Sequence, residues 1–210
     1  MATEQKAIVL SGDIVGSSFL KPGARKKLQH LLDVFITESV QEWPDLQVQQ
    51  YRGDSIQAIL TTNRSAALRM ALLLHSNLIK YAFKIRLAIG VGRISFKSKE
   101  VITSDGSAFQ ASGPYLDALV KSGELISIAG TEDDFTAEWQ VHSSSLDHLI
   151  QHWSIQQAEA VYLQLQSLTQ EAIAQKLKIK QPAVYYRLQG AGWPVVNKIL
   201  TRFESVIPMV

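Results

Sequence analysis

Two aspartates, each beside a short apolar segment, constrain the fold of this chain more than any other feature. Asp13 follows the apolar run 7–10, and Asp54 lies in the turn between the alternating segments 48–51 and 56–60. A Gly-Asp turn between two alternating segments predicts a β-hairpin. If the first apolar run becomes a strand beside this hairpin, both carboxylates reach the same edge of one sheet. Mg²⁺ is usually held by one or two protein carboxylates plus substrate phosphates, so the pair is a candidate metal–nucleotide site.

The rest of the first two thirds of the chain alternates between helical and strand patterns. Apolar residues at three- and four-residue spacing predict helices over about 22–43, 64–80 and 107–120. Further strands are expected over 85–92 and near 94–96, 100–102, 124–128 and 137–141. Gly90 and Gly92 would permit a close backbone approach. This order predicts an α+β fold, an antiparallel sheet with helices on one face.

Residues 143–153 have the pattern of a boundary, after which the chain reads as wholly helical. Helices are predicted over about 154–165, 169–177, 181–190 and 194–206, which divides the chain into domains 1–148 and 149–210. Residues 150–210 carry six Lys or Arg and three Asp or Glu, while the whole chain has a net charge of only +2. A small basic excess in the last segment is compatible with an anionic partner.

The segment from Trp153 to Trp193 resembles the bacterial helix-turn-helix of many transcription regulators. Its two short helices are separated by the tight turn Lys178-Ile179-Lys180. The resemblance implies that the second helix enters the major groove of DNA, with Gln and Arg side chains on base edges and Lys side chains on phosphates. The alternative is a helical hairpin that packs on the main domain or forms a dimer. The candidate DNA-binding residues are Thr169, Lys178, Lys180, Gln181, Ala183, Tyr185, Tyr186 and Arg187.

Four motifs in residues 6–130 carry a second resemblance. They are 11–18 (SGDIVGSS), 52–54 (RGD), 89–92 (IGVG) and 106–109 (GSAF). Their order is similar to that of the SatD family and, more distantly, of the catalytic domain of class III nucleotide cyclases. The resemblance implies a ferredoxin-like sheet and a two-metal site for Mg²⁺ or Mn²⁺. The metal ligands would be Asp13, Asp54 and the carbonyl of Ile14.

The loop after Asp13 is the candidate phosphate-binding segment. Backbone amides ahead of a helix can hold a phosphate, and hydroxyls can add contacts. The residues that would do so are Ile14, Val15, Gly16, Ser17 and Ser18. The alternative is structural: Gly-Asp is a favoured hairpin turn without any metal, and Asp13 can bond the amides of its own loop.

Three positions depart from the cyclase pattern. Gln50 stands where cyclases have a base-reading lysine, and Gln110 and Pro114 stand where they have an asparagine and an arginine that stabilise the reacting phosphates. Losing a charged contact of that kind removes several kcal/mol of transition-state stabilisation. We therefore do not expect cyclase activity. We also expect Pro114, with Ser112 and Gly113, to disturb the helix around it.

Composition narrows the class of protein. The chain has no cysteine, which excludes disulfides and thiolate chemistry. The first residues lack a signal-peptide pattern, and no apolar run approaches the ~20 residues of a membrane span, so a cytoplasmic protein without a membrane partner is expected. The preferred hypothesis is a DNA-binding transcriptional regulator, a homodimer whose cyclase-like domain binds a ligand such as a nucleotide with Mg²⁺. The alternatives are a metal-dependent enzyme acting on a nucleotide triphosphate and a protein-interaction module without a ligand.

Overall fold

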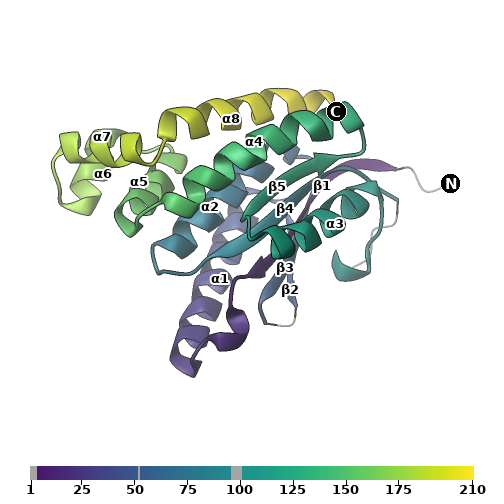
Figure 1. Cartoon of the computed structure of the whole chain (residues 1–210), viewed down its shortest axis with the longest axis horizontal. Coiled ribbons are helices and arrows are strands. Elements are labelled where there is room, and N and C mark those ends of the chain that lie inside the picture. The colour runs from purple at the N-terminus through teal and green to yellow at the C-terminus, as the bar shows by residue number, and fades with distance from the viewer. Residues whose placement is uncertain (1–3, 52, 96–100) are drawn as a thin grey trace.

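The computed structural model describes residues 4–51, 53–95 and 101–210 (Figure 1). Five strands form one sheet in the order β2-β3-β1-β4-β5. The strands are β1 (Gln5–Ile14), β2 (Gln47–Tyr51), β3 (Ser55–Leu60), β4 (Ile85–Ile94) and β5 (Ile126–Gly130). The helices are α1 (Pro22–Glu42), α2 (Ala67–Ile79), α3 (Ser107–Ser122), α4 (Asp133–His152), α5 (Ile155–Leu165), α6 (Gln170–Leu177), α7 (Gln181–Gly190) and α8 (Trp193–Val206).

The part from β1 to β4 has ferredoxin-like topology. Its order along the chain is β1-α1-β2-β3-α2-β4, and β1 pairs antiparallel with both β3 and β4, while β2 pairs antiparallel with β3. The α+β class and the ferredoxin-like sheet are therefore confirmed. The predicted hairpin is present as β2 and β3, and β1 lies directly beside it.

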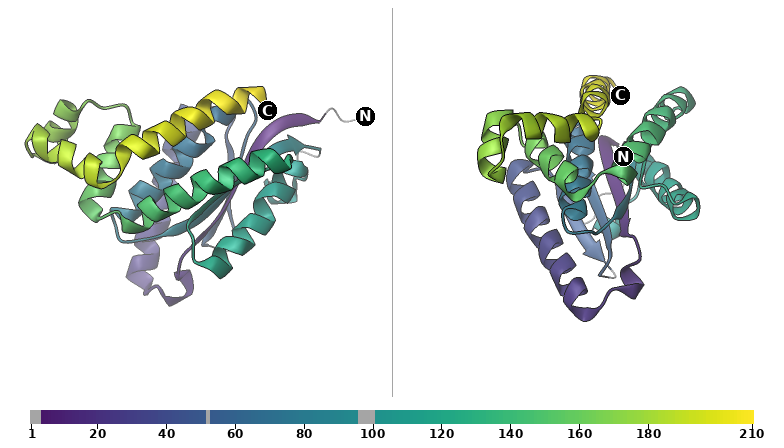
Figure 2. Two further views of the ribbon diagram at one scale, coloured as in Figure 1. Left: turned by 45° about the horizontal axis from the view of Figure 1, so that its top comes forward. Right: turned by 60° about the vertical axis from the view of Figure 1, so that its left-hand side comes forward.

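Successive side chains of β1 point to opposite faces of the sheet, and each face has its own layer of helices. Ile8 and Leu10 belong to the large core that also contains side chains of α1 and α2. Ala7 and Val9 belong to a smaller cluster with Ala108 of α3. Figure 2 shows α3 on the side of the sheet opposite to α1.

The predicted arrangement with all helices on one face holds only as far as β4. Beyond β4 the chain crosses over through α3 and adds β5 parallel to β4. Two parallel neighbouring strands require a crossover connection of this kind. The glycines of β4 allow α3 to lie very close: a Cβ at Gly90 would be 2.2 Å from the Ala108 carbonyl oxygen, and one at Gly92 would be 2.7 Å from the Ser107 hydroxyl. The close approach predicted at these glycines is confirmed.

Helix α4 corrects one prediction, since the expected strand at 137–141 lies inside this 20-residue helix. The expected boundary region 143–153 covers the second half of the helix and its C-cap Trp153. The local alternation of Trp139 and Val141 is typical of a strand, but the longer helical period prevails. Of the shorter strands, β4 ends at Ile94 and 101–103 form a 3₁₀ turn, while the expectations at residues 96 and 100 lie outside the described residues.

Side chains of α4 also cover the outer edge of β5. Asp147 Oδ1 accepts the Leu125 amide at 2.6 Å, and the Ser143 hydroxyl accepts the Ile128 amide at 2.9 Å. The hydroxyl of Thr136 accepts the Gly130 amide at 3.0 Å. These bonds satisfy backbone donors that an edge strand would otherwise present to solvent.

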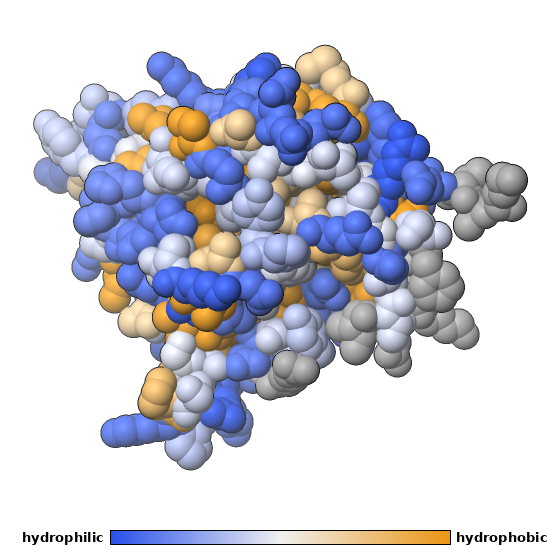
Figure 3. All heavy atoms as spheres, turned by 45° about the vertical axis from the view of Figure 1, so that its right-hand side comes forward, coloured by the Kyte–Doolittle hydropathy of each residue, from blue (hydrophilic) through white to orange (hydrophobic). Residues whose placement is uncertain are grey.

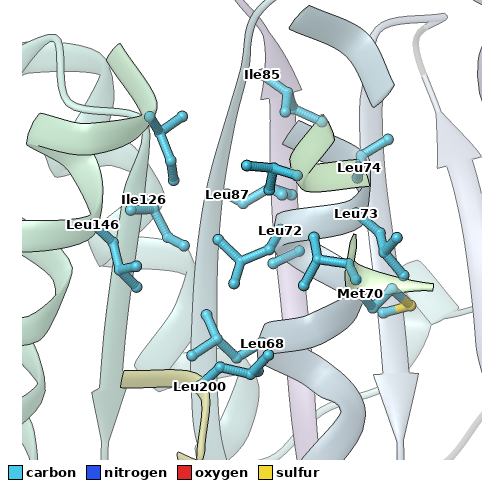
Figure 4. Close-up of a cluster of buried hydrophobic side chains, with 14 of the residues drawn as sticks. Leu68, Met70, Leu72, Leu73, Leu74, Ile85, Leu87, Ile126, Leu146 and Leu200 are labelled. Carbon is cyan, nitrogen blue, oxygen red and sulfur yellow. The ribbon is translucent and has the colours of Figure 1, made fainter. Parts of the chain in front are cut away.

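The C-terminal helices share the main core. Leu200 of α8 packs beside Leu68 of α2, and Leu146 of α4 lies beside Ile126 of β5 (Figure 4). Phe203 is fully buried against the ring of Trp139, with centroids 5.1 Å apart in an edge-to-face arrangement. One continuous apolar cluster therefore joins α8 to the sheet.

His75, in the middle of α2, is a polar group inside this core. Its side chain is 1% exposed, and neither ring nitrogen has a hydrogen-bond partner among the described residues. Burial lowers the pKa of His75 from its ordinary value of 6.5 to about 3. The imidazole is therefore held neutral.

No helix in the described part of the chain combines the length and apolarity that crossing a bilayer would need. On the face of the molecule drawn in Figure 3, hydrophobic residues appear as separate spots among hydrophilic ones.

Candidate functional site

The two aspartates of the sequence motifs meet at one end of the sheet. Asp13 is the penultimate residue of β1, and its partner in the antiparallel register is Ser55, the residue after Asp54. The amide of Ile14 donates to the Asp54 carbonyl oxygen at 3.0 Å, which joins the end of β1 to the β2–β3 turn. The strand neighbourhood that the site requires is therefore present.

Asp13 is held by a residue that the sequence analysis did not single out. Arg86 lies opposite Asp13 in the β1–β4 register, and its Nη1 donates to Asp13 Oδ2 at 3.1 Å. The other carboxylate oxygen, Oδ1, is buried without a hydrogen-bond partner in the described chain. Burial raises the pKa of Asp13; the Arg86 guanidinium opposes that rise, and the nearby charge of Asp54 adds to it. A cation at Oδ1 would satisfy this oxygen.

Asp54 is bonded to the loop that follows β1. The Ser17 hydroxyl donates to Asp54 Oδ2 at 2.5 Å, and the Ser55 hydroxyl lies 3.4 Å from Oδ1. Gly16 has φ 69°, a left-handed conformation that glycine adopts without strain and that turns the chain into a 3₁₀ turn at Ser17–Phe19. This turn places Ser17 next to the β2–β3 hairpin.

The five predicted phosphate-binding residues differ in what their amides do. The amides of Ile14 and Val15 are already bonded to the carbonyls of Asp54 and Lys84, at 3.0 and 2.9 Å. The amides of Gly16, Ser17 and Ser18 donate no hydrogen bond to any described residue. Only this second group remains available to an anion.

A cavity of about 320 Å³ opens beside the loop. It is lined by Ser17, Ser18, Leu20, Arg25, Leu28, Gln29, Gly53 and Asp54. Arg25 Nη2 donates to the Ser17 carbonyl at 3.2 Å, so a guanidinium lies at the same loop. Phe19 is 90% exposed. Arg25 and Gln29 were not singled out from the sequence, because only the packing of α1 brings them to this loop.

The three residues that depart from the cyclase pattern lie on two elements, Gln50 on β2 and Gln110 and Pro114 on α3. Gln50 exchanges hydrogen bonds with Gln29 and donates to the Gly53 carbonyl at 3.0 Å. Gln110 is exposed on α3, and this helix runs through Pro114 to Ser122. The expected disturbance of the helix is therefore wrong.

No group of three or more His, Cys, Asp or Glu side chains that could hold a metal occurs in the parts of the chain that the structure covers. The donor set at the sheet end is the carboxylate pair and nearby backbone oxygens. Such a set fits Mg²⁺ or Mn²⁺ arriving with a phosphate ligand, since these ions take few protein carboxylates when phosphates supply the rest.

The C-terminal helices form a second candidate site. Helices α6 and α7 are joined by residues 178–180, and Thr169 caps α6 by accepting the Ala172 amide at 3.2 Å. Lys178 has φ 55° and ψ 42°, a left-handed conformation at the turn position where helix-turn-helix proteins often have glycine. Of the six apolar side chains expected to point inward in this segment, Ile173, Ala174, Val184 and Leu188 are buried, and Leu177 and Ile179 are partly buried.

Six of the eight candidate DNA-binding residues are exposed: Thr169, Lys178, Lys180, Ala183, Tyr185 and Tyr186. The other two, Gln181 and Arg187, are partly buried, and each is already bonded to another side chain. Gln181 Nε2 donates to Gln170 Oε1 at 2.6 Å, and Arg187 Nη1 forms an ion pair with Glu159 at 3.3 Å.

The fold and the site together define an α+β protein with a ferredoxin-like sheet and a carboxylate pair at one sheet end. No model of a known protein family matches the chain, and no curated protein matches its sequence. Membership in the SatD family thus stays a prediction.

Solved structures similar to the chain include two described as a bacterial light-regulated adenylyl cyclase. One has a TM-score of 0.47 and 14% sequence identity, over 60% of this chain and 76% of that chain. The other has a TM-score of 0.42 and 17% identity, over 60% of this chain and 43% of that chain. The light response and the cyclase activity belong to those proteins.

Proposed function

We propose that the chain is a cytoplasmic DNA-binding regulator of the SatD family, with residues 149–210 binding DNA and residues 1–148 binding a ligand. The observation that carries the proposal is the outward face of α7. Its exposed side chains, Pro182, Ala183, Tyr185, Tyr186 and Gln189, include no carboxylate. Lys178 and Lys180 precede the helix and are exposed. The negatively charged phosphate backbone of DNA is attracted to a surface that carries lysines and no carboxylates.

The packing of α6 and α7 supports the same proposal. Val184 and Leu188 anchor α7 in the core, which fixes the helix while its opposite face stays in solvent. In helix-turn-helix proteins the N-terminal part of the second helix contacts base edges. Gln181 occupies that position, and its bond to Gln170 would be exchanged for a base contact. Arg187 would likewise leave Glu159 to reach DNA.

Fluorescence anisotropy with labelled genomic fragments tests DNA binding. We expect affinity to fall steeply with salt, and the slope to drop by about 0.9 for each phosphate contact removed. Lys178→Asn and Lys180→Gln remove charge, and asparagine tolerates the left-handed conformation at position 178. Lys121→Gln, on α3, is the matched control. Absence of salt-sensitive binding by the folded protein would instead favour the protein-interaction module.

A second candidate function rests on the carboxylate pair. We infer that Asp13 and Asp54 hold Mg²⁺ or Mn²⁺ brought by a nucleotide, with the carbonyl of Ile14 as a further ligand. The unpartnered Oδ1 of Asp13 and the unbonded amides of Gly16, Ser17 and Ser18 support this inference. A bound metal ion would neutralise phosphate charge. Arg86 would keep the Asp13 carboxylate in one orientation.

Thermal-shift measurements with ATP and GTP, with and without Mg²⁺ or Mn²⁺, test this site. A ligand that binds only the native state raises the melting temperature. We expect the shift to need the metal, to vanish in Asp13→Asn with Asp54→Asn, and to persist in Asp117→Asn on α3. A shift that survives the double substitution would contradict the carboxylate model. Product analysis after incubation with triphosphates distinguishes a sensor from an enzyme.

A DNA-binding regulator of this size would act as a homodimer on two half-sites. Light scattering of the purified chain measures the mass in solution. A monomer at the concentrations that bind DNA would contradict this part of the proposal.

A further inference from the structure

The N-terminal half of α1 and the loop before it carry a cluster of positive charge. Residues 14–32 contain four Lys or Arg and no Asp or Glu. The four cations, Lys21, Arg25, Lys26 and Lys27, are all exposed. None of them forms an ion pair with a residue that the structure describes. Their charge is therefore available to an anionic partner.

The turn between α2 and β4 extends this cluster. Lys27 Nζ lies 4.5 Å from the centroid of the Tyr81 ring, and Lys80 Nζ lies 5.7 Å from the same centroid. Tyr81 is 39% exposed, so this ring, with a cation from each element beside it, lies at the surface. An aromatic ring attracts a nearby ammonium group. The cations of α1 and of the turn therefore belong to one surface.

The same surface reaches the C-terminal helices at Lys176 of α6, which is exposed. Burial lowers the pKa of Lys80; the charge of Glu159 opposes this, that of Lys176 adds to it and that of Glu38 opposes it. Lys80 is thus close enough to Lys176 to respond to its charge, and Glu159 is already paired with Arg187. The start of α1, the α2–β4 turn and α6 all lie on the left-hand side of Figure 1.

We propose that DNA bound by α7 continues across this lysine surface, defined as Lys26, Lys27, Lys80 and Lys176, and that its phosphates contact these side chains. The DNA contact then extends from residues 149–210 onto the main domain, so the inference rests on the proposed DNA binding. Lys and Tyr side chains commonly contact phosphate oxygens, and such contacts position a protein on the duplex without reading its sequence. The lysine surface adds affinity and salt dependence but no base preference.

The competing partner for a basic surface is an anionic membrane. Phe19, in the turn before α1, is 90% exposed and could enter a lipid headgroup layer. Binding of that kind needs apolar area as well as positive charge. The apolar face of α1, with Leu28, Leu32 and Phe35, is buried in the core, which leaves little apolar surface for lipid. Continuity with α6 favours DNA.

Fluorescence anisotropy with labelled genomic fragments, measured over a range of salt concentrations, tests the inference. Lys26→Gln with Lys27→Gln should lower the slope of log affinity against log salt by about 1.8, since each lost phosphate contact removes about 0.9. Lys26→Arg with Lys27→Arg keeps the charge and should keep the slope.

The matched control is Lys6→Gln with Lys121→Gln. Both lysines are exposed; Lys6 lies at the end of β1 far from the loop that leads to α1, and Lys121 lies on α3, across the sheet. We expect the wild-type slope in this variant. An equal drop in the two glutamine double variants would show a general effect of net charge and would overturn the inference.

Lys178→Asn and Lys180→Gln separate the inference from the proposed function. If these two variants lower the slope and the Lys26–Lys27 glutamine variant does not, the C-terminal helices bind DNA alone and the lysine surface is wrong. A drop in the Lys26–Lys27 variant alone supports the lysine surface and contradicts the role of the turn at 178–180. Absence of salt-sensitive binding by the wild type overturns both.

Sedimentation with phosphatidylglycerol–phosphatidylcholine vesicles tests the membrane alternative. We expect no binding to vesicles that depends on Lys26 and Lys27. Vesicle binding that is lost in Lys26→Gln with Lys27→Gln, while the slope for DNA stays unchanged, would assign the surface to a membrane and overturn the inference.

Discussion

The neutral imidazole of His75 makes the stability of the fold depend on pH. The folded state keeps His75 unprotonated down to about pH 3, whereas the unfolded chain takes up a proton near the ordinary pKa of 6.5. Protonation of the unfolded state favours unfolding, so the contribution is fully present above pH 6.5 and is lost as the pH falls toward 3. Between about pH 7.5 and about pH 5, this linkage should reduce the free energy of unfolding by roughly 2 kcal/mol.

Urea unfolding of the wild type and of His75→Leu at both pH values measures this effect. Leucine removes two unpartnered nitrogens and is close to histidine in size. We expect His75→Leu to be at least as stable as the wild type near pH 7.5 and to lose about 2 kcal/mol less on acidification. His30→Gln, which replaces an exposed histidine of α1, is the control and should keep the wild-type pH dependence. An unchanged pH dependence in His75→Leu would refute the reasoning.

Three further predictions about local geometry can be tested by denaturant unfolding. Gly90→Ala should destabilise the fold by about 2 kcal/mol or more because the added Cβ meets backbone of α3. Gly113→Ala, where no atom of the described residues lies within 4 Å of the added Cβ, should be neutral or stabilising. Equal effects of the two substitutions would contradict the close approach of α3. Lys178→Gly should stabilise the fold by roughly 0.5–1 kcal/mol because glycine adopts the left-handed conformation without strain. Lys176→Gly, inside α6, should cost about 1 kcal/mol of stability. A loss of stability in both variants would contradict the assigned turn. Ser154→Ala should cost about 1 kcal/mol because the Ser154 hydroxyl caps α5 by accepting the Gln157 amide, and no loss of stability would contradict this role.

Local signals predicted much of the fold. Pro22 at the start of α1 and Pro44 just after its end bracket the helix found at Pro22–Glu42. The C-terminal helices were also predicted to within a residue or so at most ends, since Gly192 and the turn at 178–180 interrupt them clearly. In these segments propensity and tertiary packing agree.

Helix α4 could not be predicted from a short window. Over 137–141 the residues alternate as in a strand, but the buried positions Trp139, Ser143, Leu146 and Ile150 follow the helical period. Only the longer pattern distinguishes the two. The position of α3 on the opposite face of the sheet has no local signal either, because it depends on the crossover to β5.

The candidate site was predictable in position but not in its contacts. The hairpin signal around Asp54 brought the two carboxylates to neighbouring strands. The contact of Arg86 with Asp13 could not be predicted from local pattern because the two residues are 73 positions apart, although a charged residue between the apolar Ile85 and Leu87 is a usable signal. A cavity lined by Trp43, Leu73 and Tyr162 has no local signature, because α1, α2 and α5, which form it, are distant in sequence.

The hydrogen bonds from α4 to the edge of β5 have a consequence for self-association. Growth of a fibre by strand addition requires each molecule to offer two open sheet edges, one to each neighbour. The amides of Ile128 and Gly130 in β5, and that of Leu125 just before the strand, are already bonded to side chains of α4. An incoming strand would have to detach a helix anchored by the fully buried Trp139 before it could pair there. The folded protein is therefore protected from end-to-end polymerisation at that edge for as long as α4 stays docked.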